Sequence, residues 1–106
     1  MKIYIAGKVA GDKNYKTKFF QAALPLVEAG HTVLLPSMLP SSGLTEADYM
    51  RICLAMIDTA DLVLFLPDYT ESQGAMVEWY FCQKTGKPCD TFTEWMNRKE
   101  GEASCE

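Results

Sequence analysis

The stretch LVLFLPDYTESQGAMVE, residues 62–78, decides the fold class. Its opening run, Leu62 to Leu66, is the most hydrophobic part of the chain and offers no polar side chain to solvent, so it predicts a strand buried on both faces. A helical segment follows from Gln73 to Thr85 and ends at Gly86-Lys87-Pro88. A doubly buried strand followed closely by a helix is typical of a parallel sheet covered by helices.

Two similar strand and helix pairs come earlier in the chain. The strands are expected at Lys2 to Ala6 and His31 to Leu35, and the helices at Asn14 to Ala29 and Thr45 to Asp58. Pro25 lies inside the first of these helices and predicts a kink rather than a break. Three alternations with short connections predict an α/β fold, a three-layer Rossmann-like (flavodoxin-like) domain with a small parallel sheet of about four strands.

The end of the chain is less regular. A fourth strand is expected at Cys89 to Phe92, although this run is short and polar. Thr93 to Lys99 predicts a brief helix, and the last residues, GEASCE, are expected to be frayed. We therefore expect a domain over residues 1–92, followed by a short C-terminal helix and tail over 93–106.

Length and composition argue against several classes of protein. At 106 residues the chain is one small domain, and its apolar content of 48% and charged content of 23% are ordinary for a globular protein. The net charge is -4 and the ten Lys and Arg residues are scattered, so we expect no nucleic acid partner. The N-terminal MKIYIAG is too short for a signal sequence and no apolar run approaches the ~20 residues of a membrane span, so a cytoplasmic location is expected.

The four cysteines are Cys53, Cys82, Cys89 and Cys105. They form no Cys-x-x-Cys pair, and the single histidine, His31, does not complete a usual zinc set with them. Reduced thiols in a cytosolic protein are therefore expected, and the sequence predicts neither a metal site nor a cofactor.

Two loops lie where open α/β sheets bind ligands, beyond the carboxyl ends of the strands. The first, from Gly7 through Lys8 to Asp12, matches neither of the glycine-rich nucleotide motifs. The second runs from Pro67 to Gln73 and leads into a helix. The second loop is therefore the stronger candidate for a binding site.

Ser72 and Gly74 open the helix after this second loop. Ser72 is a natural N-cap, and the small residues after it leave the first amides open to an anion at the positive end of the helix dipole. Glu78 lies one turn beyond Gly74 on the same face, where Phe81 and Cys82 follow it, so this carboxylate is expected to face a cleft. On the residues alone, a solvated surface glutamate and an ordinary capped helix start stay open as alternatives.

Four motifs together resemble a known family. They are IYIAG at residues 3–7, GHTVLLPS at 30–37, ADLVLFLPD at 60–68, and S-x-G-A-x-x-E at 72–78 with a following GKP. In this order and spacing the chain, over about residues 1 to 88, resembles the nucleoside 2-deoxyribosyltransferase-like superfamily. Its branch of short bacterial and phage proteins is the nearest in pattern, and the 2′-deoxynucleoside 5′-monophosphate N-hydrolases are a relative.

The resemblance implies a carboxylate nucleophile. In this family the glutamate that matches Glu78 attacks C1′ of a deoxyribose, the base leaves, and a glycosyl-enzyme ester forms. Water then gives hydrolysis, and a second base gives transfer. Tyr4 resembles the family tyrosine near the nucleophile. By the same resemblance, Gly7 and Lys8 line the phosphate or base side of the pocket.

Ser72 refines the expected substrate. In the transferases an Asp commonly stands at this position and holds the 5′-hydroxyl, whereas the monophosphate hydrolases have a Ser that contacts the 5′-phosphate. An Asp would repel a phosphate, while a Ser at a helix N-terminus donates to it. The resemblance therefore implies a small-molecule substrate, a nucleotide in preference to a nucleoside, bound with the help of Ser72 and Gly74.

The chain departs from the family pattern at Cys53, where relatives often carry an Asp that orients the sugar and the nucleophile. This thiol makes a catalytically degenerate nucleotide-binding or regulatory module the alternative, and a purely structural or protein-binding domain a third one. The resemblance also implies a homodimer or higher homo-oligomer. Trp79 and Tyr80 are interpreted as packing residues, and His31 as inert.

Overall fold

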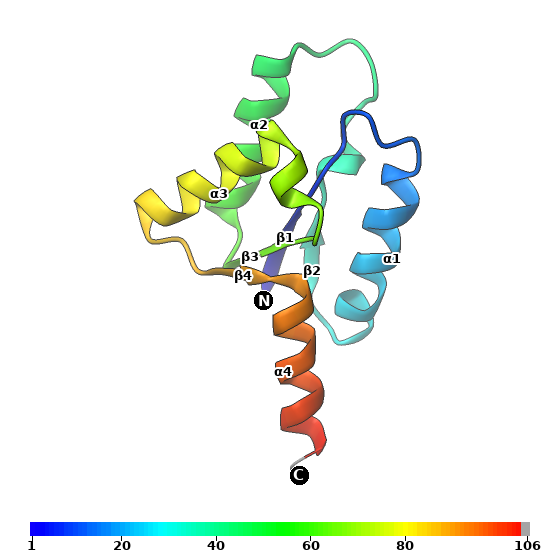
Figure 1. Ribbon diagram of the computed structural model, residues 1–106, viewed down its shortest axis with the longest axis vertical. Helices are drawn as coiled ribbons and strands as arrows, with labels where there is room; N and C mark the ends of the chain where they lie inside the picture. Colours follow the sequence, from blue (N-terminus) through cyan, green and yellow to red (C-terminus); the bar gives the residue numbers. More distant parts are fainter. Residues whose placement is uncertain (105–106) are drawn as a thin grey trace.

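The chain forms one parallel sheet, seen in a computed structural model that describes the backbone of residues 1–104 and the side chains of residues 1–98. The strands are β1 (Lys2–Ala6), β2 (Thr32–Leu34), β3 (Leu62–Phe65) and β4 (Cys89–Thr91), in the order β2-β1-β3-β4. All neighbouring strands pair in parallel (Figure 1). The predicted α/β fold with a small parallel sheet of about four strands is confirmed.

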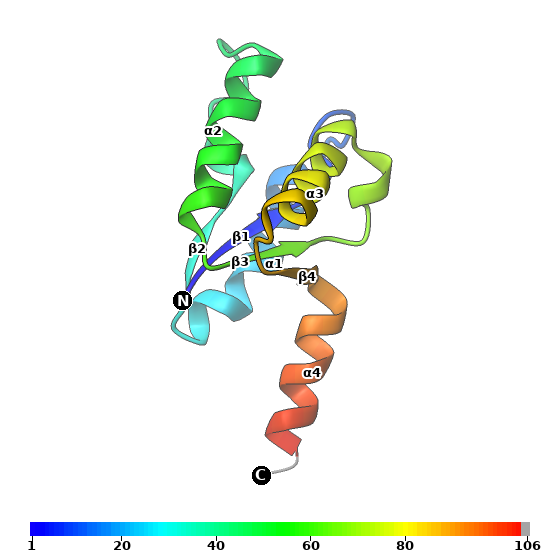
Figure 2. The ribbon, with the colours of Figure 1, turned by 90° about the vertical axis from the view of Figure 1, so that its left-hand side faces the viewer.

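Helices cover both faces of this sheet. They are α1 (Tyr15–Glu28), α2 (Glu46–Thr59), α3 (Gln73–Thr85) and α4 (Phe92–Ser104), with short 3₁₀ turns η1 (Pro36–Met38) and η2 (Tyr69–Glu71). Side chains of α1 and α4 pack in one core cluster, and side chains of α2 and α3 pack in a second cluster on the other face of the sheet. The result is three layers, with α4 leading away from the body of the molecule in both ribbon views (Figures 1 and 2).

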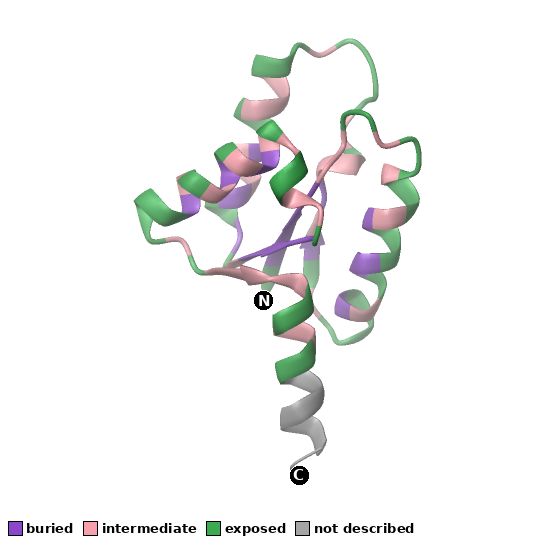
Figure 3. Cartoon of the chain, viewed as in Figure 1, coloured by how far each residue is buried: buried purple, intermediate pink, exposed green. Residues whose placement is uncertain are grey.

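The central strands explain the position of the two clusters. Successive residues of β1 point to opposite faces, so Ile3 and Ile5 enter the first cluster while Tyr4 and Ala6 enter the second. All four are fully buried, and β1 and β3 are drawn mainly in the colour of buried residues in Figure 3. A strand that is apolar on both sides needs a helix layer on both sides, which is why β1 and β3 are central.

The helix boundaries follow local sequence signals. Thr45 and Asp48 form a reciprocal capping box at the start of α2. Gly30 and Gly86 take positive φ angles of 94° and 73° just after α1 and α3, a conformation that glycine adopts without a side-chain clash. Helix α1 continues through Pro25 without a break, as the sequence predicts, and a kink at Pro25 stays a prediction.

The C-terminal part differs most from the prediction. The polar run Cys89–Thr91 pairs with β3 as an edge strand, and α4 starts directly after it at Phe92. Helix α4 is longer than the predicted 93–99, since it runs from Phe92 to Ser104. Its first turns are held by Phe92, Trp95 and Met96, which pack against the first core cluster. The last two residues of GEASCE lie outside the described residues, and a boundary at residue 92 stays a prediction. Within the described chain, no helix combines the length and apolar character needed to cross a membrane.

Candidate active site

A cleft of about 820 Å³ lies among the segments that follow β1, β2 and β3. This is the end of a parallel sheet where α/β proteins bind ligands. The residues that line the cleft are Tyr4, Gly7, Val9, Ala10, Tyr15, Pro36, Leu39, Pro40, Ser41, Glu46, Tyr49, Met50, Cys53, Glu71, Ser72, Gln73, Gly74, Ala75, Val77 and Glu78. Five of the six residues that the sequence singles out as site residues are among them.

Glu78 and Tyr4 form a hydrogen-bonded pair in the wall of this cleft. The Glu78 side chain comes from the second turn of α3 and is only 5% exposed, while Tyr4 comes from β1 and is fully buried. The Tyr4 hydroxyl donates to Glu78 Oε2 at 2.7 Å, which joins residues 74 positions apart in sequence. Because this bond uses one carboxylate oxygen, the other oxygen is left for a ligand.

The surroundings of this pair change the titration of both groups. Burial raises the pKa of Glu78 to about 7, against the opposing effect of the Tyr4 hydrogen bond. Burial, followed by the nearby Glu78 carboxylate, raises the pKa of Tyr4 well above its ordinary value, so Tyr4 remains a neutral donor. A carboxyl group whose pKa is raised toward neutral pH suits a role in which it gains and loses charge during a reaction.

Cys53 stands beside the pair. It reaches the cleft from α2 and is 7% exposed. Burial raises the pKa of Cys53, and Tyr4 and Glu78 are close enough to influence it as well. The thiol is therefore neutral at physiological pH and supplies no negative charge beside Glu78.

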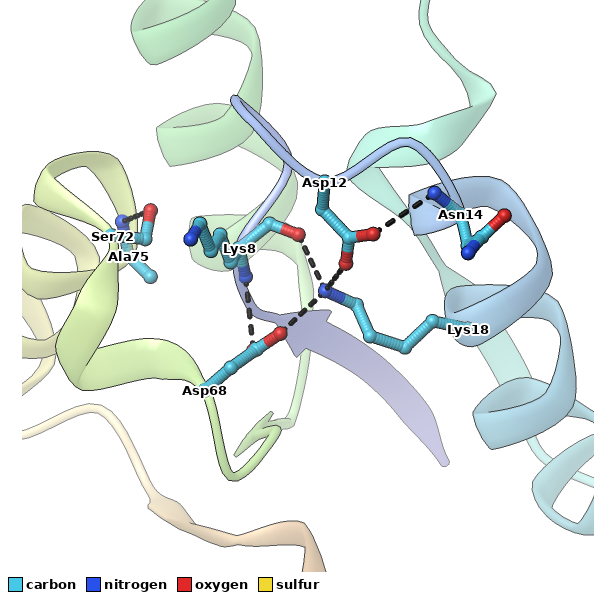
Figure 4. Close-up of polar contacts among 7 residues, drawn as sticks. All are labelled: Lys8, Asp12, Asn14, Lys18, Asp68, Ser72 and Ala75. Carbon is cyan, nitrogen blue, oxygen red and sulfur yellow. Dashed lines mark hydrogen bonds and ion pairs between the residues drawn. The ribbon is translucent and has the colours of Figure 1, made fainter.

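The start of α3 forms another part of the cleft wall. Ser72 caps the helix, with its Oγ accepting from the Ala75 amide at 3.2 Å, which confirms the predicted N-cap (Figure 4). The Ser72 hydroxyl can still donate to a ligand. A methyl group added at Gly74 would have Ser72 Oγ as its nearest neighbour at 3.9 Å, so the backbone here is open to close approach.

Gly7 and Lys8 take different positions. Gly7 lines the cleft and packs so tightly that an added Cβ would lie 3.0 Å from Leu66 Cδ1. Lys8 is not among the lining residues, and its backbone amide donates to Asp68 Oδ1 at 3.1 Å. In Figure 4 the Lys8 side chain extends from its loop toward Ser72.

The site also contains residues that the sequence did not single out. Part of the lining comes from the segment around η1 and from α2 and includes Leu39, Tyr49 and Met50, and the Tyr49 hydroxyl donates to the Pro40 carbonyl. The two prolines between residues 36 and 40 were a signal for an ordered turn, but not for its contact with the site.

Three aromatic side chains of α3 lie outside the cleft lining. Phe81, which follows Glu78 along α3, packs against the second core cluster, and the side chain that contacts the carboxylate is that of Tyr4. Trp79 packs against the same cluster, as predicted for a packing residue, and Tyr80 is 57% exposed. Among side chains 1–98, no group of three or more His, Cys, Asp and Glu residues could hold a metal ion.

Comparisons with known proteins agree with this fold. The sequence matches, over residues 1–91, the family described as Domain of unknown function (DUF4406). No curated protein matches it. A solved structure of a 2-deoxyribosyltransferase from the psychrotolerant bacterium Bacillus psychrosaccharolyticus matches with a TM-score of 0.61 and 25% identity, over 84% of this chain and 69% of that one. That enzyme is described as a biocatalyst for nucleoside synthesis. The resemblance to the nucleoside 2-deoxyribosyltransferase-like superfamily is confirmed, and the chain has the fold of a nucleoside-handling enzyme.

Proposed function

We propose that this chain, which belongs to the DUF4406 family, cleaves the base-sugar bond of a (deoxy)nucleoside 5′-monophosphate with Glu78 as nucleophile. The observation that carries the proposal is the buried Glu78 carboxylate, held by Tyr4 in the wall of a large cleft. Burying an acid without a cationic partner is costly, so its retention at a ligand-sized cleft favours a chemical role. The likeness to a 2-deoxyribosyltransferase supports the same reaction class.

The reaction would proceed in two steps. In the first, the Glu78 oxygen that does not bind Tyr4 attacks C1′, the bond from C1′ to the base nitrogen breaks, and its electron pair leaves with the base. In the second, water attacks C1′ of the resulting ester and releases Glu78, or a second base attacks and a new nucleotide forms. Tyr4 would hold the carboxylate in position and donate to it while it is ionised.

The start of α3 would bind the 5′-phosphate. The Ser72 hydroxyl and the first-turn amides of Gln73 and Gly74, which have no acceptor within the helix, provide donors, and the positive end of the helix dipole favours an anion there. Lys8 extends toward the same helix end in Figure 4 and would add a positive charge at the rim. The lining of the cleft also contains Glu46, Glu71 and Glu78, and Glu71 directly precedes Ser72, so the donors at the helix end would have to outweigh the repulsion between these carboxylates and a phosphate.

A second candidate function is nucleotide binding without turnover. Cys53 is the observation that favours it, because the neutral thiol stands beside Tyr4, at the position where relatives often carry a carboxylate. A module of this kind would keep the cleft, the capped helix and the loops, but it would no longer cleave the base-sugar bond at an appreciable rate. Binding and turnover must therefore be measured separately.

The test is release of free base, followed by chromatography, from a panel of the four deoxynucleoside 5′-monophosphates. Wild-type protein is compared with Glu78→Gln and Ser72→Asp. We expect Glu78→Gln to stop release, and Ser72→Asp, which keeps a capping oxygen, to shift preference from nucleotides to nucleosides.

The outcomes separate the candidate functions. Absence of base from every substrate, together with a nucleotide that raises the melting temperature, would favour the binding module. If neither release nor a thermal shift is seen, both candidate functions fail. Far-ultraviolet circular dichroism of each variant is the control for folding.

A further inference from the structure

Lys18 is the centre of a polar cluster that joins two of the loops lining the cleft. Its ammonium donates to the Lys8 carbonyl oxygen at 2.6 Å, to Asp12 Oδ2 at 2.7 Å and to Asp68 Oδ2 at 2.6 Å (Figure 4). The other oxygen of Asp68 accepts from the Lys8 amide. We call this group of Lys8 backbone, Asp12, Lys18 and Asp68 the Lys18 clasp.

The clasp joins three segments that are distant in sequence. Lys8 and Asp12 belong to the loop between β1 and α1, Lys18 is in the first turns of α1, and Asp68 belongs to the loop between β3 and α3. Lys18 and Asp68 are 50 residues apart. Both loops contribute cleft-lining residues, Val9 on one side and Ser72 on the other, so the clasp ties together two walls of the same cleft.

The charges of the clasp are well matched. The Lys18 and Asp68 side chains are 25% and 24% exposed, which screens their attraction less than full exposure would. Burial alone lowers the pKa of Lys18, but the hydrogen bonds that Lys18 donates to Asp12 and Asp68 outweigh it and raise the pKa. The hydrogen bond from Lys18 is the main cause that lowers the pKa of Asp12. Lys18 and Asp12 therefore stay charged at neutral pH.

The backbone at Gly7 is closely packed beside the clasp. A Cβ added at Gly7 would lie 3.2 Å from Asp68 Oδ1 and 3.0 Å from Leu66 Cδ1. The loop after β1 thus lies directly against the segment after β3, at the place where the clasp closes. A single ammonium with three acceptors fixes this approach more narrowly than one exposed ion pair could.

We infer that Lys18 is a positioning residue, which sets the spacing of the two loops so that the phosphate end of the cleft is formed before a ligand binds. The inference rests on the proposed function for the identity of the ligand. Pre-organisation of this kind lowers the entropy cost of binding and should appear as affinity. Lys18 itself would not touch the reacting atoms.

The first test needs no ligand. Hydrogen exchange of the full chain is followed by mass spectrometry for wild type, Lys18→Met and Lys16→Met, the last an exposed residue on the same helix whose loss changes the net charge equally. We expect amides of residues 7–13 and 67–72 to exchange at least about tenfold faster in Lys18→Met alone, with the β1 and β3 core unchanged. Equal exchange of both loops in all three proteins would overturn the inference.

The second test measures affinity without turnover. In a Glu78→Gln background, the four deoxynucleoside 5′-monophosphates are titrated by calorimetry with Lys18 intact or changed to Met. We expect at least a roughly tenfold loss of affinity with Lys18→Met and little change with Lys16→Met. Loops that loosen while affinity stays the same would reduce the clasp to a stability element and overturn the positioning role.

The two proposals fail in different ways. If no nucleotide binds while Lys18 is intact, the proposed function fails, and the exchange result alone decides whether the clasp couples the loops. If nucleotides bind and are cleaved at wild-type rates after Lys18→Met, the proposed function stands and the positioning role falls.

Discussion

The Tyr4–Glu78 pair and the Lys18 clasp both join distant segments at the same cleft, but they differ in how their charges are compensated. The clasp pairs opposite charges, whereas the acid of the pair has a neutral partner. The clasp surrounds a cation with two carboxylates and leaves it a quarter exposed. The pair removes an acid from water, and a neutral hydroxyl is its hydrogen-bond partner. Paired charges hold structure at little cost, whereas a buried acid with a pKa of about 7 weakens the fold whenever it ionises. We therefore propose that the pair takes part in chemistry and that the clasp supports it.

The largest expected effect is the loss of base release when Glu78 of the pair is replaced. Glu78→Gln keeps the size and the hydrogen-bond acceptor for Tyr4 but cannot form the ester, so base release should fall by at least about 10³-fold. Rates are measured by chromatography under single-turnover conditions. Glu71→Gln, an exposed acid of the same cleft, is the matched control and should retain most of the rate. Similar rates for both variants would remove Glu78 from the mechanism.

The same substitution tests the cost of the buried acid. Because its pKa is raised from 4.5 to about 7, the folded protein holds a proton that the unfolded chain releases, and wild type loses stability as pH rises through this window. Glu78→Gln has no such loss. Its free energy of unfolding should exceed that of wild type by roughly 3 kcal/mol above pH 8, with the excess shrinking toward pH 4. Urea unfolding at both pH values measures it, and a constant difference would contradict the raised pKa.

The substitution Gly7→Ala tests the close packing of the loop after β1 beside the Lys18 clasp. Gly7→Ala would press on Leu66 and on the Asp68 carboxylate, so we expect a loss of about 1–3 kcal/mol of stability and faster exchange in the loops of the clasp. Gly74→Ala is the control, since its methyl group meets nothing closer than 3.9 Å. If Gly7→Ala is as stable as Gly74→Ala in urea unfolding, the close approach at Gly7 is not a constraint.

Tyr4→Phe removes the hydrogen bond to Glu78 and leaves the carboxyl group in place. The Tyr4 hydrogen bond lowers the pKa of Glu78, so its loss should move that pKa above 7. Since the ionised carboxylate is the attacking form, the rise of activity with pH should shift by roughly one unit toward higher pH. The pH profile of base release checks this. A shift toward lower pH would show that Tyr4 serves another purpose.

The smallest effect concerns the phosphate end. Gly74→Ala should leave stability unchanged or raise it by up to about 1 kcal/mol, because alanine favours a helix more than glycine does. Its methyl group would nevertheless stand where a phosphate approaches the first amides, so nucleotide affinity should drop several-fold while nucleoside affinity changes little. Titration of both ligands in the Glu78→Gln background decides this, and equal losses for both would argue against a phosphate there.

Local signals made most of the fold predictable from the sequence. Helix ends are marked by residues within one turn of them, namely the caps at Thr45 and Ser72 and the glycines after α1 and α3. The apolar runs of β1 and β3 predict that these strands are buried. Strand β4 was harder to predict, because a short polar run at a sheet edge is recognised only through its partner strand.

The site was predictable only in part, for the same reason. Glu78 and Ser72 lie on one helix and could be related by spacing, whereas Tyr4 was singled out by family resemblance alone. The contact between Lys18 and Asp68 spans 50 residues and left no local signal. The wall formed by Leu39 and Tyr49 depends likewise on how α2 packs on the sheet.

The most direct test of the central claim is the mass of the protein quenched in acid shortly after mixing with a cleaved deoxynucleoside 5′-monophosphate. A Glu78 nucleophile requires a transient ester with deoxyribose 5-phosphate. We expect wild type to gain the mass of that group on the peptide that contains Glu78, and Glu78→Gln to gain none. An adduct on a peptide without Glu78, or base release by Glu78→Gln at the wild-type rate, would contradict the claim.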